Sequence, residues 1–490
     1  MNSKNTENAE HQLLQTIEKN VLGYSLTFTG PFGKNRAIYC DYTASGRPLK
    51  FIEDFITKHV YPIYANTHTD TGIMARQTSM LREEARQIIK KAVNASDEYV
   101  LIFTGSGTTS AVNKLVHCMR LKKATNTVIL IGPYEHHSNI LPWKECGAKV
   151  IRITEDKLGL VDMAVLESSL KRYAGTDRLL IGCFSAASNV TGIMSDTYAI
   201  SVMLHKYGAL AFWDYATAGP YVHINVTPSS KTRGTDPSKD AIYLSPHKFV
   251  GGVGTPGVLI ARKRLFINFV PDLPGGGTVT YVTRESHLYV QDIQEREEGG
   301  TPAIVESIRA GITFHVKELV GTDLIERREK QLAIRALRRW KSNPNLIILG
   351  STSVQRLPIF SFMIVHPHSG KVLHHNVVAV LLNDLYGIQA RSGCACAGPY
   401  SQDLLGIDET LAKRFTHFLA VRGKFNRELD CHHCLQPDGC NICGTKTPFS
   451  SLDEKHLTKR ESPLQILNST LIPKLENGST SRRRNKYLER

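Results

Sequence analysis

The chain contains 490 residues, of which 41% are hydrophobic and 21% are charged, and its formal net charge is +15. This length and composition predict a soluble globular protein with a substantial core and two domains. The first twenty residues lack an apolar signal core and an arginine-rich amphipathic pattern, and no uncharged run reaches membrane-spanning length. We therefore expect a cytoplasmic protein without a membrane segment.

Residues 1–60 are expected to form an N-terminal arm, and an amphipathic helix over 79–93 leads into the first domain. Seven short apolar runs predict buried strands, and most of them are separated by helix-sized segments. These runs are 99–103, 127–131, 149–153, 179–184, 209–213, 241–244 and 258–261. The alternation predicts an α/β large domain over 61–300, with a mainly parallel sheet and helices on both faces.

A smaller α+β domain is expected over 301–420. A charged helical stretch at 302–340 precedes strands near 346–349 and 359–365 and a helix near 376–385. After about residue 420 the periodicity fades, so 421–490 is predicted to be a poorly ordered tail. Residues 411–490 carry fifteen Lys and Arg against eight Asp and Glu. A basic end of this kind is usually solvated, which weakens the case for nucleic acid as a partner.

Distinctive polar clusters follow the predicted strands, at the sheet edge where ligands gather in open parallel sheets. A glycine-rich turn with Thr108 and Thr109 opens a helix after 99–103, and backbone amides at such a helix start can hold phosphate. His136 follows the strand at 127–131, where an imidazole can stack on a planar cofactor and move protons. Taken singly, the turn also suits an ordinary loop, and a histidine pair is more often structural.

Three further clusters complete this edge. Asn189 and Asp214 follow the next two strands, and a carboxylate beside a pyridine nitrogen keeps that nitrogen protonated. Asp214 by itself would equally suit a helix cap. Ser245, His247 and Lys248 lie between the strand at 241–244 and a glycine-rich stretch at 251–257. A lysine amine serves covalent chemistry only when its pocket lowers its pKa and holds an aldehyde against it.

In this order the clusters resemble class V aminotransferase-like enzymes, which have the pyridoxal 5′-phosphate (PLP)-dependent transferase fold type I. Over residues 35–410 the chain is particularly similar to cysteine desulfurases, selenocysteine lyases and the amino-terminal domain of molybdenum cofactor sulfurases. The resemblance implies that Lys248 is the Schiff-base lysine, Asp214 the pyridinium partner, His136 the stacking histidine and Asn189 the ring-oxygen contact. It implies phosphate contacts for Thr108, Thr109, Ser245 and His247.

The same resemblance implies a homodimer. Thr301 lies in a Glu-Gly-Gly-Thr-Pro motif whose threonine usually reaches the cofactor phosphate of a neighbouring subunit. Thr217 stands where many desulfurases carry a glutamine, three residues after the acid, and its hydroxyl can still donate a hydrogen bond to the cofactor.

Residues 391–399 indicate which of the possible reactions the protein catalyses. The planar fork of Arg391 suits a substrate carboxylate, and Cys396, five residues later, can attack the sulfur of a bound cysteine. The resemblance thus implies release of alanine from L-cysteine through a persulfide on Cys396, with sulfur passed to an acceptor protein. Cys394 remains a second candidate for the nucleophile, and the residues do not distinguish cysteine from selenocysteine. Transamination, elimination, epimerisation or a scaffold with little turnover are the alternatives.

The ten cysteines are too sparse for a disulfide scaffold, and six of them lie in the last hundred residues. Four of these six form two Cys-x-x-Cys pairs, a spacing common in zinc sites. The pairs are Cys431 with Cys434 and Cys440 with Cys443. Their five-residue spacer is short for a zinc ribbon, so a reduced, flexible tail is the alternative. The strand and helix that usually complete the small domain after the cysteine loop have no convincing equivalent.

Overall fold

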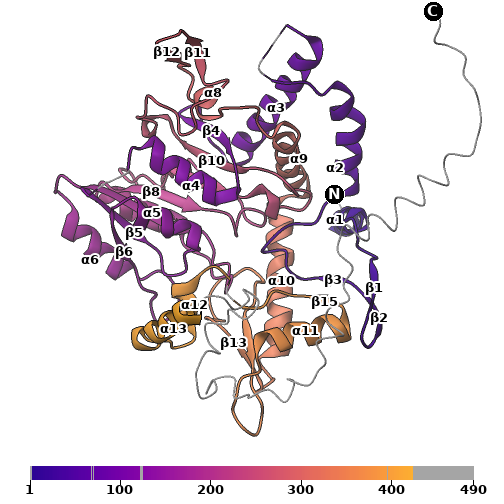
Figure 1. The fold of residues 1–490 in the computed structure, drawn as a ribbon. Coiled ribbons are helices and arrows are strands. Elements are labelled where there is room, and N and C mark those ends of the chain that lie inside the picture. Colours follow the sequence, from indigo (N-terminus) through magenta and orange to yellow (C-terminus); the bar gives the residue numbers. More distant parts are fainter. Residues whose placement is uncertain (1–2, 68, 70, 122–124, 394, 423–490) are drawn as a thin grey trace, which may run out of the picture.

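The computed structural model describes residues 3–422 except 68, 70, 122–124 and 394 (Figure 1). A seven-stranded sheet with the order β4-β10-β9-β8-β7-β5-β6 forms its centre. The strands are β4 (Tyr99–Thr104), β5 (Thr127–Ile131), β6 (Lys149–Arg152), β7 (Leu179–Ser185), β8 (Leu210–Asp214), β9 (Ala241–Leu244) and β10 (Gly257–Arg262). The strands β6, β5, β7, β8 and β9 pair in parallel, whereas β10 is antiparallel to both of its neighbours. The predicted mainly parallel α/β sheet is confirmed.

Helices cover both faces of this sheet, because alternate residues of each strand point to opposite sides. In β4, Leu101 packs into one hydrophobic cluster and Ile102 into the other. The first face is covered chiefly by α3 (Ile73–Ala92), α6 (Met163–Tyr173), α7 (Thr197–Lys206) and α9 (Ile304–Val320), and the second by α4 (Gly107–Cys118) and α5 (Leu141–Glu145). The helices α6 and α7 begin at the aspartate caps Asp162 and Asp196, whose carboxylates accept backbone N–H groups of the first turn.

The helical stretch predicted over 302–340 is divided into two helices, α9 and α10 (Thr322–Trp340). The break falls at Gly321, whose φ is +85°. Residues with a side chain rarely adopt this backbone conformation, so glycine is the residue that allows the chain to turn here. The helix α9 then packs on α3, where Gly311 approaches Ala85 so closely that a Cβ would clash.

The small part of the molecule is built from both ends of the chain. The strands β13 (Leu346–Ile348) and β14 (Phe362–Ile364) pair antiparallel, and β15 (Ile388–Gln389) pairs in parallel with β3 (Ile38–Tyr39). The remaining N-terminal elements are α1 (Ser3–Asn20), β1 (Thr27–Gly30), β2 (Gly33–Arg36) and α2 (Lys50–Phe55). The last elements of the described chain are α11 (His375–Tyr386), α12 (Gly398–Leu404) and α13 (Glu409–Arg422). At the large part, β11 (Val279–Val282) and β12 (His287–Tyr289) form a separate hairpin, and α8 (Ile293–Glu297) contacts β4 (Figure 1). Residues 38–39 therefore bring the N-terminal segment beside the chain that leads to Arg391.

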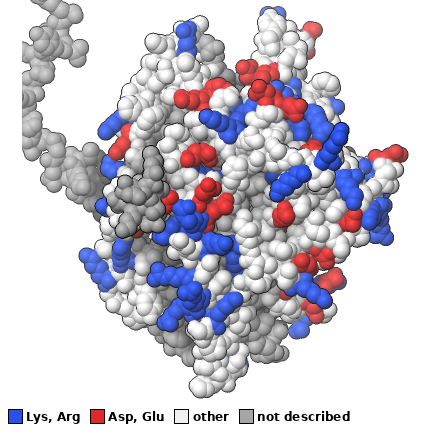
Figure 2. All heavy atoms as spheres, turned by 180° about the vertical axis from the view of Figure 1, so that it is seen from behind, with Lys and Arg blue, Asp and Glu red and all other residues white. Residues whose placement is uncertain are grey.

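Two further features of the molecule are its charged surface and the hydropathy of its helices. Figure 2 shows acidic and basic side chains mixed over one face, with Lys and Arg gathered in its lower half. The helix α10, which contains Arg338 and Arg339 in its last turn, is itself rich in basic residues. In the described part of the chain, the helices are all too short or too polar to pass through a bilayer.

A buried ion cluster joins α3, β4 and the segment after α8. The carboxylate of Glu298 contacts the guanidinium groups of Arg82 and Arg86 and accepts the backbone N–H of Phe103 at 2.7 Å. Phe103 is the next-to-last residue of β4, and the turn that opens α4 follows this strand. The cluster therefore fixes the end of β4 from which the candidate site begins.

Candidate active site

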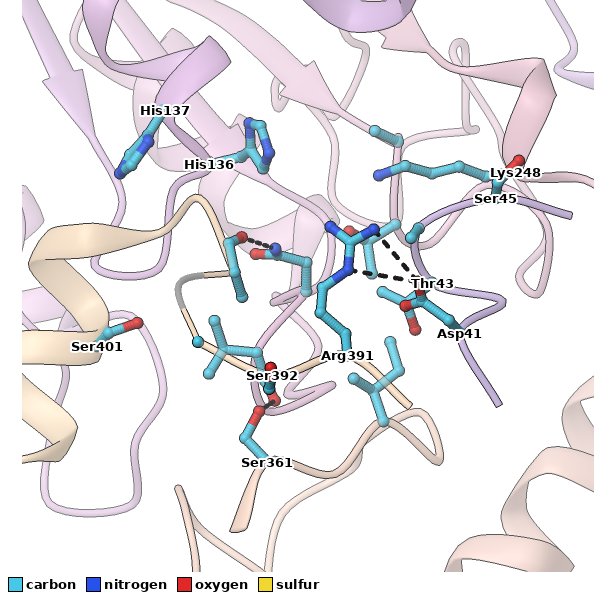
Figure 3. Close-up of a pocket in the computed structure, with 18 of the residues that line it drawn as sticks. Asp41, Thr43, Ser45, His136, His137, Lys248, Ser361, Arg391, Ser392 and Ser401 are labelled. Atoms are coloured by element: carbon cyan, nitrogen blue, oxygen red, sulfur yellow. Dashed lines mark hydrogen bonds and ion pairs between the residues drawn. The ribbon is translucent and has the colours of Figure 1, made fainter. Parts of the chain in front are cut away.

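A cavity of about 1140 Å³ opens at the carboxyl ends of the parallel strands, between the large and small parts (Figure 3). Its walls contain most of the residues that the sequence singled out. These are Thr108, Thr109, His136, Asn189, Asp214, Thr217, Ser245, His247, Lys248 and Arg391. Cys396 lies in the segment whose neighbours Ala395 and Gly398 line the cavity. Thr301 is exposed outside this lining, where its hydroxyl accepts a 3.4 Å hydrogen bond from Asn66.

The start of α4 and the end of β9 form a polar cradle. The backbone N–H of Thr108 donates to the Ser245 hydroxyl at 3.0 Å, and the Thr109 hydroxyl lies 2.6 Å from that of Ser138. Gly107 has a φ of +53°, and a Cβ there would lie 2.9 Å from the Ser245 oxygen. A side chain would thus fill the space between helix start and serine. Backbone amides at a helix start together with hydroxyl groups suit a phosphate.

Asp214 ends β8 and is buried at the cavity wall, where one carboxylate oxygen accepts the Ala216 N–H at 2.7 Å. Burial raises the pKa of this carboxyl, and the nearby Lys248 ammonium opposes that rise. Among the described residues, no cation lies within ion-pair distance of Asp214. A buried carboxylate of this kind needs a positive partner, and a protonated ring nitrogen in the cavity supplies one.

Lys248 extends into the cavity opposite His136 (Figure 3). Burial lowers the pKa of the Lys248 amine, which increases its deprotonated, nucleophilic fraction, although Asp214 acts in the other direction. Burial and the positive charge of Lys248 lower the pKa of His136 to about 4. The Nδ1 atom of His136 accepts the N–H of Ser138 at 3.1 Å, so the neutral ring carries its hydrogen on Nε2. A neutral imidazole at this point suits stacking against a planar ring.

Arg391 reaches the cavity with its guanidinium group paired to Asp41. The Nε and Nη2 atoms lie 3.3 and 3.2 Å from one Asp41 carboxylate oxygen (Figure 3). The pairing of β3 with β15 brings the two residues together across 350 positions. Sequence reasoning missed Asp41. The only available signal was an acidic residue after a short apolar run, the pattern that had singled out Asp214.

The segment that carries Cys396 is held against the large part of the molecule. The Asn189 side-chain amide donates to the Ala395 carbonyl at 2.6 Å, and the His137 N–H donates to the Cys396 carbonyl at 2.7 Å. An amide has two N–H groups, so this bond leaves Asn189 a donor for a cofactor ring oxygen. His137 was not among the residues predicted to serve the site, because a histidine beside the stacking candidate has no distinguishing sequence signal.

The predicted zinc ligands and the alternative nucleophile lie outside the described residues. This applies to Cys394 and to the two Cys-x-x-Cys pairs at 431–434 and 440–443. Within the part that the structure describes, no three His, Cys, Asp or Glu side chains are grouped so that they could hold a metal ion.

Comparison with known proteins places this geometry in a family. The family model described as "Aminotransferase class-V" matches residues 38–412. The chain is 29% identical over 391 residues to the "Probable cysteine desulfurase" of Halalkalibacterium halodurans, covering 78% of this chain and 88% of the relative. It is 27% identical over 380 residues to the protein of the same name from Streptomyces coelicolor, covering 74% and 84%.

Two solved structures agree with this match. The apo cysteine desulfurase of Thermococcus onnurineus superposes with a TM-score of 0.66 at 25% identity, covering 80% of this chain and 91% of that one. The Escherichia coli cysteine desulfurase CsdA, at 23% identity, superposes with a TM-score of 0.61, covering 76% and 88%, and supports the fold alone.

PLP is the cofactor that this family implies, and the residues around the cavity fit it. A lysine with a lowered pKa, a buried carboxylate that no described cation pairs with, a neutral imidazole and a glycine-lined polar cradle face one space. We conclude that the chain belongs to the class V aminotransferase family and has the architecture of fold type I.

Proposed function

We propose that the protein is a PLP-dependent cysteine desulfurase, which removes sulfur from L-cysteine and releases alanine. The observation that carries this proposal is the docking of the Cys396 segment at the cavity that contains Lys248 and Arg391. The relatives named as cysteine desulfurases, which match over most of their length, support the same reaction.

Bound PLP would supply an aldehyde that captures the substrate amine and a ring that accepts electrons from the substrate carbon. Lys248 would hold the aldehyde until substrate replaces it, and its amine would then move protons at the substrate carbon. Asp214 would face the ring nitrogen, His136 would cover the ring, and Asn189 would bond the ring oxygen. The alcohol and amide groups of Thr108, Thr109, Thr217 and Ser245, with His247, would hold the phosphate and ring substituents.

Arg391 would bind the substrate carboxylate with the part of its guanidinium group that Asp41 leaves available. The Cys396 thiolate would attack the substrate sulfur, forming an S–S bond while the C–S bond breaks. The electron pair of that C–S bond stays with the carbon, which takes a proton from Lys248 or His136 to give alanine. The sulfur remains on Cys396 as a persulfide until an acceptor thiol removes it.

The proposal also includes a homodimer. Thr301 lies outside the cavity of its own chain, which supports a homodimer in which it serves the cavity of a second copy. A protein as sulfur acceptor and a cytoplasmic location stay predictions.

The test uses the purified full chain loaded with PLP. The visible absorption band should be fixed by borohydride to Lys248, and L-cysteine should yield alanine and a persulfide on Cys396. Cys396→Ser should keep the band and lose both products, whereas Lys248→Ala should lose the band.

Cys394→Ser is the matched control, and it should keep alanine release. If Cys394→Ser is inactive and Cys396→Ser is active, the nucleophile is Cys394. Unchanged alanine release in both variants would contradict a persulfide mechanism at either cysteine. Pyruvate, ammonia and sulfide as products would instead favour elimination, and 3-mercaptopyruvate would favour transamination.

A further inference from the structure

The Cys396 segment is bonded to one residue at two points, at the cysteine itself and two residues after it. The backbone N–H of His137 donates to the Cys396 carbonyl at 2.7 Å, and its ring Nε2 accepts the Gly398 N–H at 2.9 Å. We propose that His137 is a positioning residue that clamps the nucleophile segment in the pose needed for sulfur transfer. The assignment of the nucleophile rests on the proposed function, whereas the clamp itself can be measured without turnover.

The segment needs an external partner for two reasons. Cys396 has a φ of +55°, a conformation that residues with a side chain rarely adopt and that persists only when the surroundings fix it. The helix α12 begins at Gly398 after the N-cap residue Ala397, whose methyl group cannot accept a backbone N–H. His137 meets both needs, because it bonds the carbonyl of the strained residue and replaces the missing cap.

The base of this clamp is rigid. His137 opens the short helical turn His137–Asn139, and Asn139 donates to the buried carboxylate of Glu135 at 2.6 Å. The same carboxylate accepts the N–H and the hydroxyl of Ser185 at the end of β7, at 2.8 and 2.6 Å. The turn is therefore fixed to the central sheet, and a group held by it is fixed as well.

The two adjacent histidines serve different sides of the turn. Both side chains line the cavity, but the His137 ring points away from Lys248, towards the helix that carries Ser401 (Figure 3). The two adjacent histidines thus link the position of the proposed ring-stacking group, His136, to the position of the proposed nucleophile, Cys396. The Asn189 bond to the Ala395 carbonyl adds a third point of attachment just before the cysteine.

Two substitutions test the side-chain part of the clamp in the PLP-loaded full chain. His137→Phe keeps the ring volume and removes the acceptor for Gly398, and His137→Gln places an amide oxygen near the position of Nε2. His417→Phe, on the exposed side of α13, is the matched control. The first readout is the rate of iodoacetamide reaction at Cys396 without substrate, assigned to that residue by peptide fragmentation. The second is the persulfide formation rate, compared with the L-cysteine concentration that half-saturates the spectral change.

Loss of one hydrogen bond should change the alkylation rate of Cys396 by about three- to tenfold in His137→Phe. Persulfide formation should slow by a similar factor while the half-saturating L-cysteine concentration stays the same, and His137→Gln should restore both rates. The proposal is overturned if His137→Phe alkylates at the wild-type rate, or if its main effect is on substrate binding. If the wild-type protein forms no persulfide at all, the proposed function fails, and the alkylation rates still decide whether the clamp exists.

Discussion

Replacing Glu298 with glutamine removes the buried negative charge of the ion cluster beside the candidate phosphate turn. The Glu298 side chain is only 6% exposed, that of Arg86 is 4% exposed, and the two lie 3.0 Å apart. Arg82 approaches the same carboxylate from its other oxygen. Glutamine keeps the size and one oxygen that can accept the Phe103 N–H, so the change isolates the charge.

The expected loss in the free energy of unfolding is about 3–5 kcal/mol, because removing one partner leaves buried guanidinium groups uncompensated. Glu83→Gln provides the control within the same cluster. Its carboxylate also contacts Arg86 at 3.0 Å but is 51% exposed, so its loss should cost less than about 1 kcal/mol.

Acid titration gives an independent check. Burial by itself would raise the pKa of Glu298, but Arg86 and Arg82 outweigh it and the pKa is lowered. A lowered carboxyl pKa contributes stability above the unfolded value of about 4.3, and that stability is lost as the pH falls towards the folded value. Glu298→Gln should therefore lose less stability than wild type between pH 5 and 3, a window taken as roughly one unit around that reference.

The measurement is urea unfolding of the PLP-loaded protein, followed by the visible band and by far-UV circular dichroism. Both probes should report the loss, because Glu298 bonds the residue that precedes the phosphate turn. If Glu298→Gln and Glu83→Gln unfold at the same urea concentration, the buried charge is not a source of stability and the reasoning fails.

Three further substitutions address the cavity. Asp41→Asn should raise the KM for L-cysteine by up to about fivefold with little change in kcat. The reason is that a part-exposed ion pair that orients Arg391 is worth about 1 kcal/mol or less. A large fall in kcat would contradict this expectation. Gly107→Ala should weaken PLP binding at least about tenfold in equilibrium dialysis, because Gly107 has a positive φ and a Cβ there would contact Ser245. Unchanged binding would show that the polar cradle does not hold the phosphate. The free energy of unfolding of the wild type should fall as the pH drops from about 6.5 towards the lowered pKa of His136, since only the unfolded state then binds the proton. In urea titrations at a series of pH values, His136→Gln should make this dependence on pH weaker.

Several features of this protein could be predicted from its sequence. Buried parallel strands are continuous apolar runs, so each strand of the central sheet was located to within a residue or so at its ends. Parallel strands place the residues that follow them at one edge, which is why Lys248, His136 and Asp214, far apart in the chain, were expected to share a cavity. Both inferences use patterns that lie within a few consecutive residues.

Other features were decided only by the tertiary structure. Asp41 pairs with Arg391 because the two-residue strands β3 and β15 meet, and strands this short leave no periodic signal. His137 holds the Cys396 segment through its backbone N–H, which almost any residue type offers, and through its ring Nε2, whose partner is a backbone N–H far away in the chain. The split at Gly321 separates α9, which packs on α3, from α10, and the sequence alone does not show that this glycine takes a positive φ. Local sequence encodes burial and strand ends, whereas contacts between distant segments exist only once the chain has folded around the sheet.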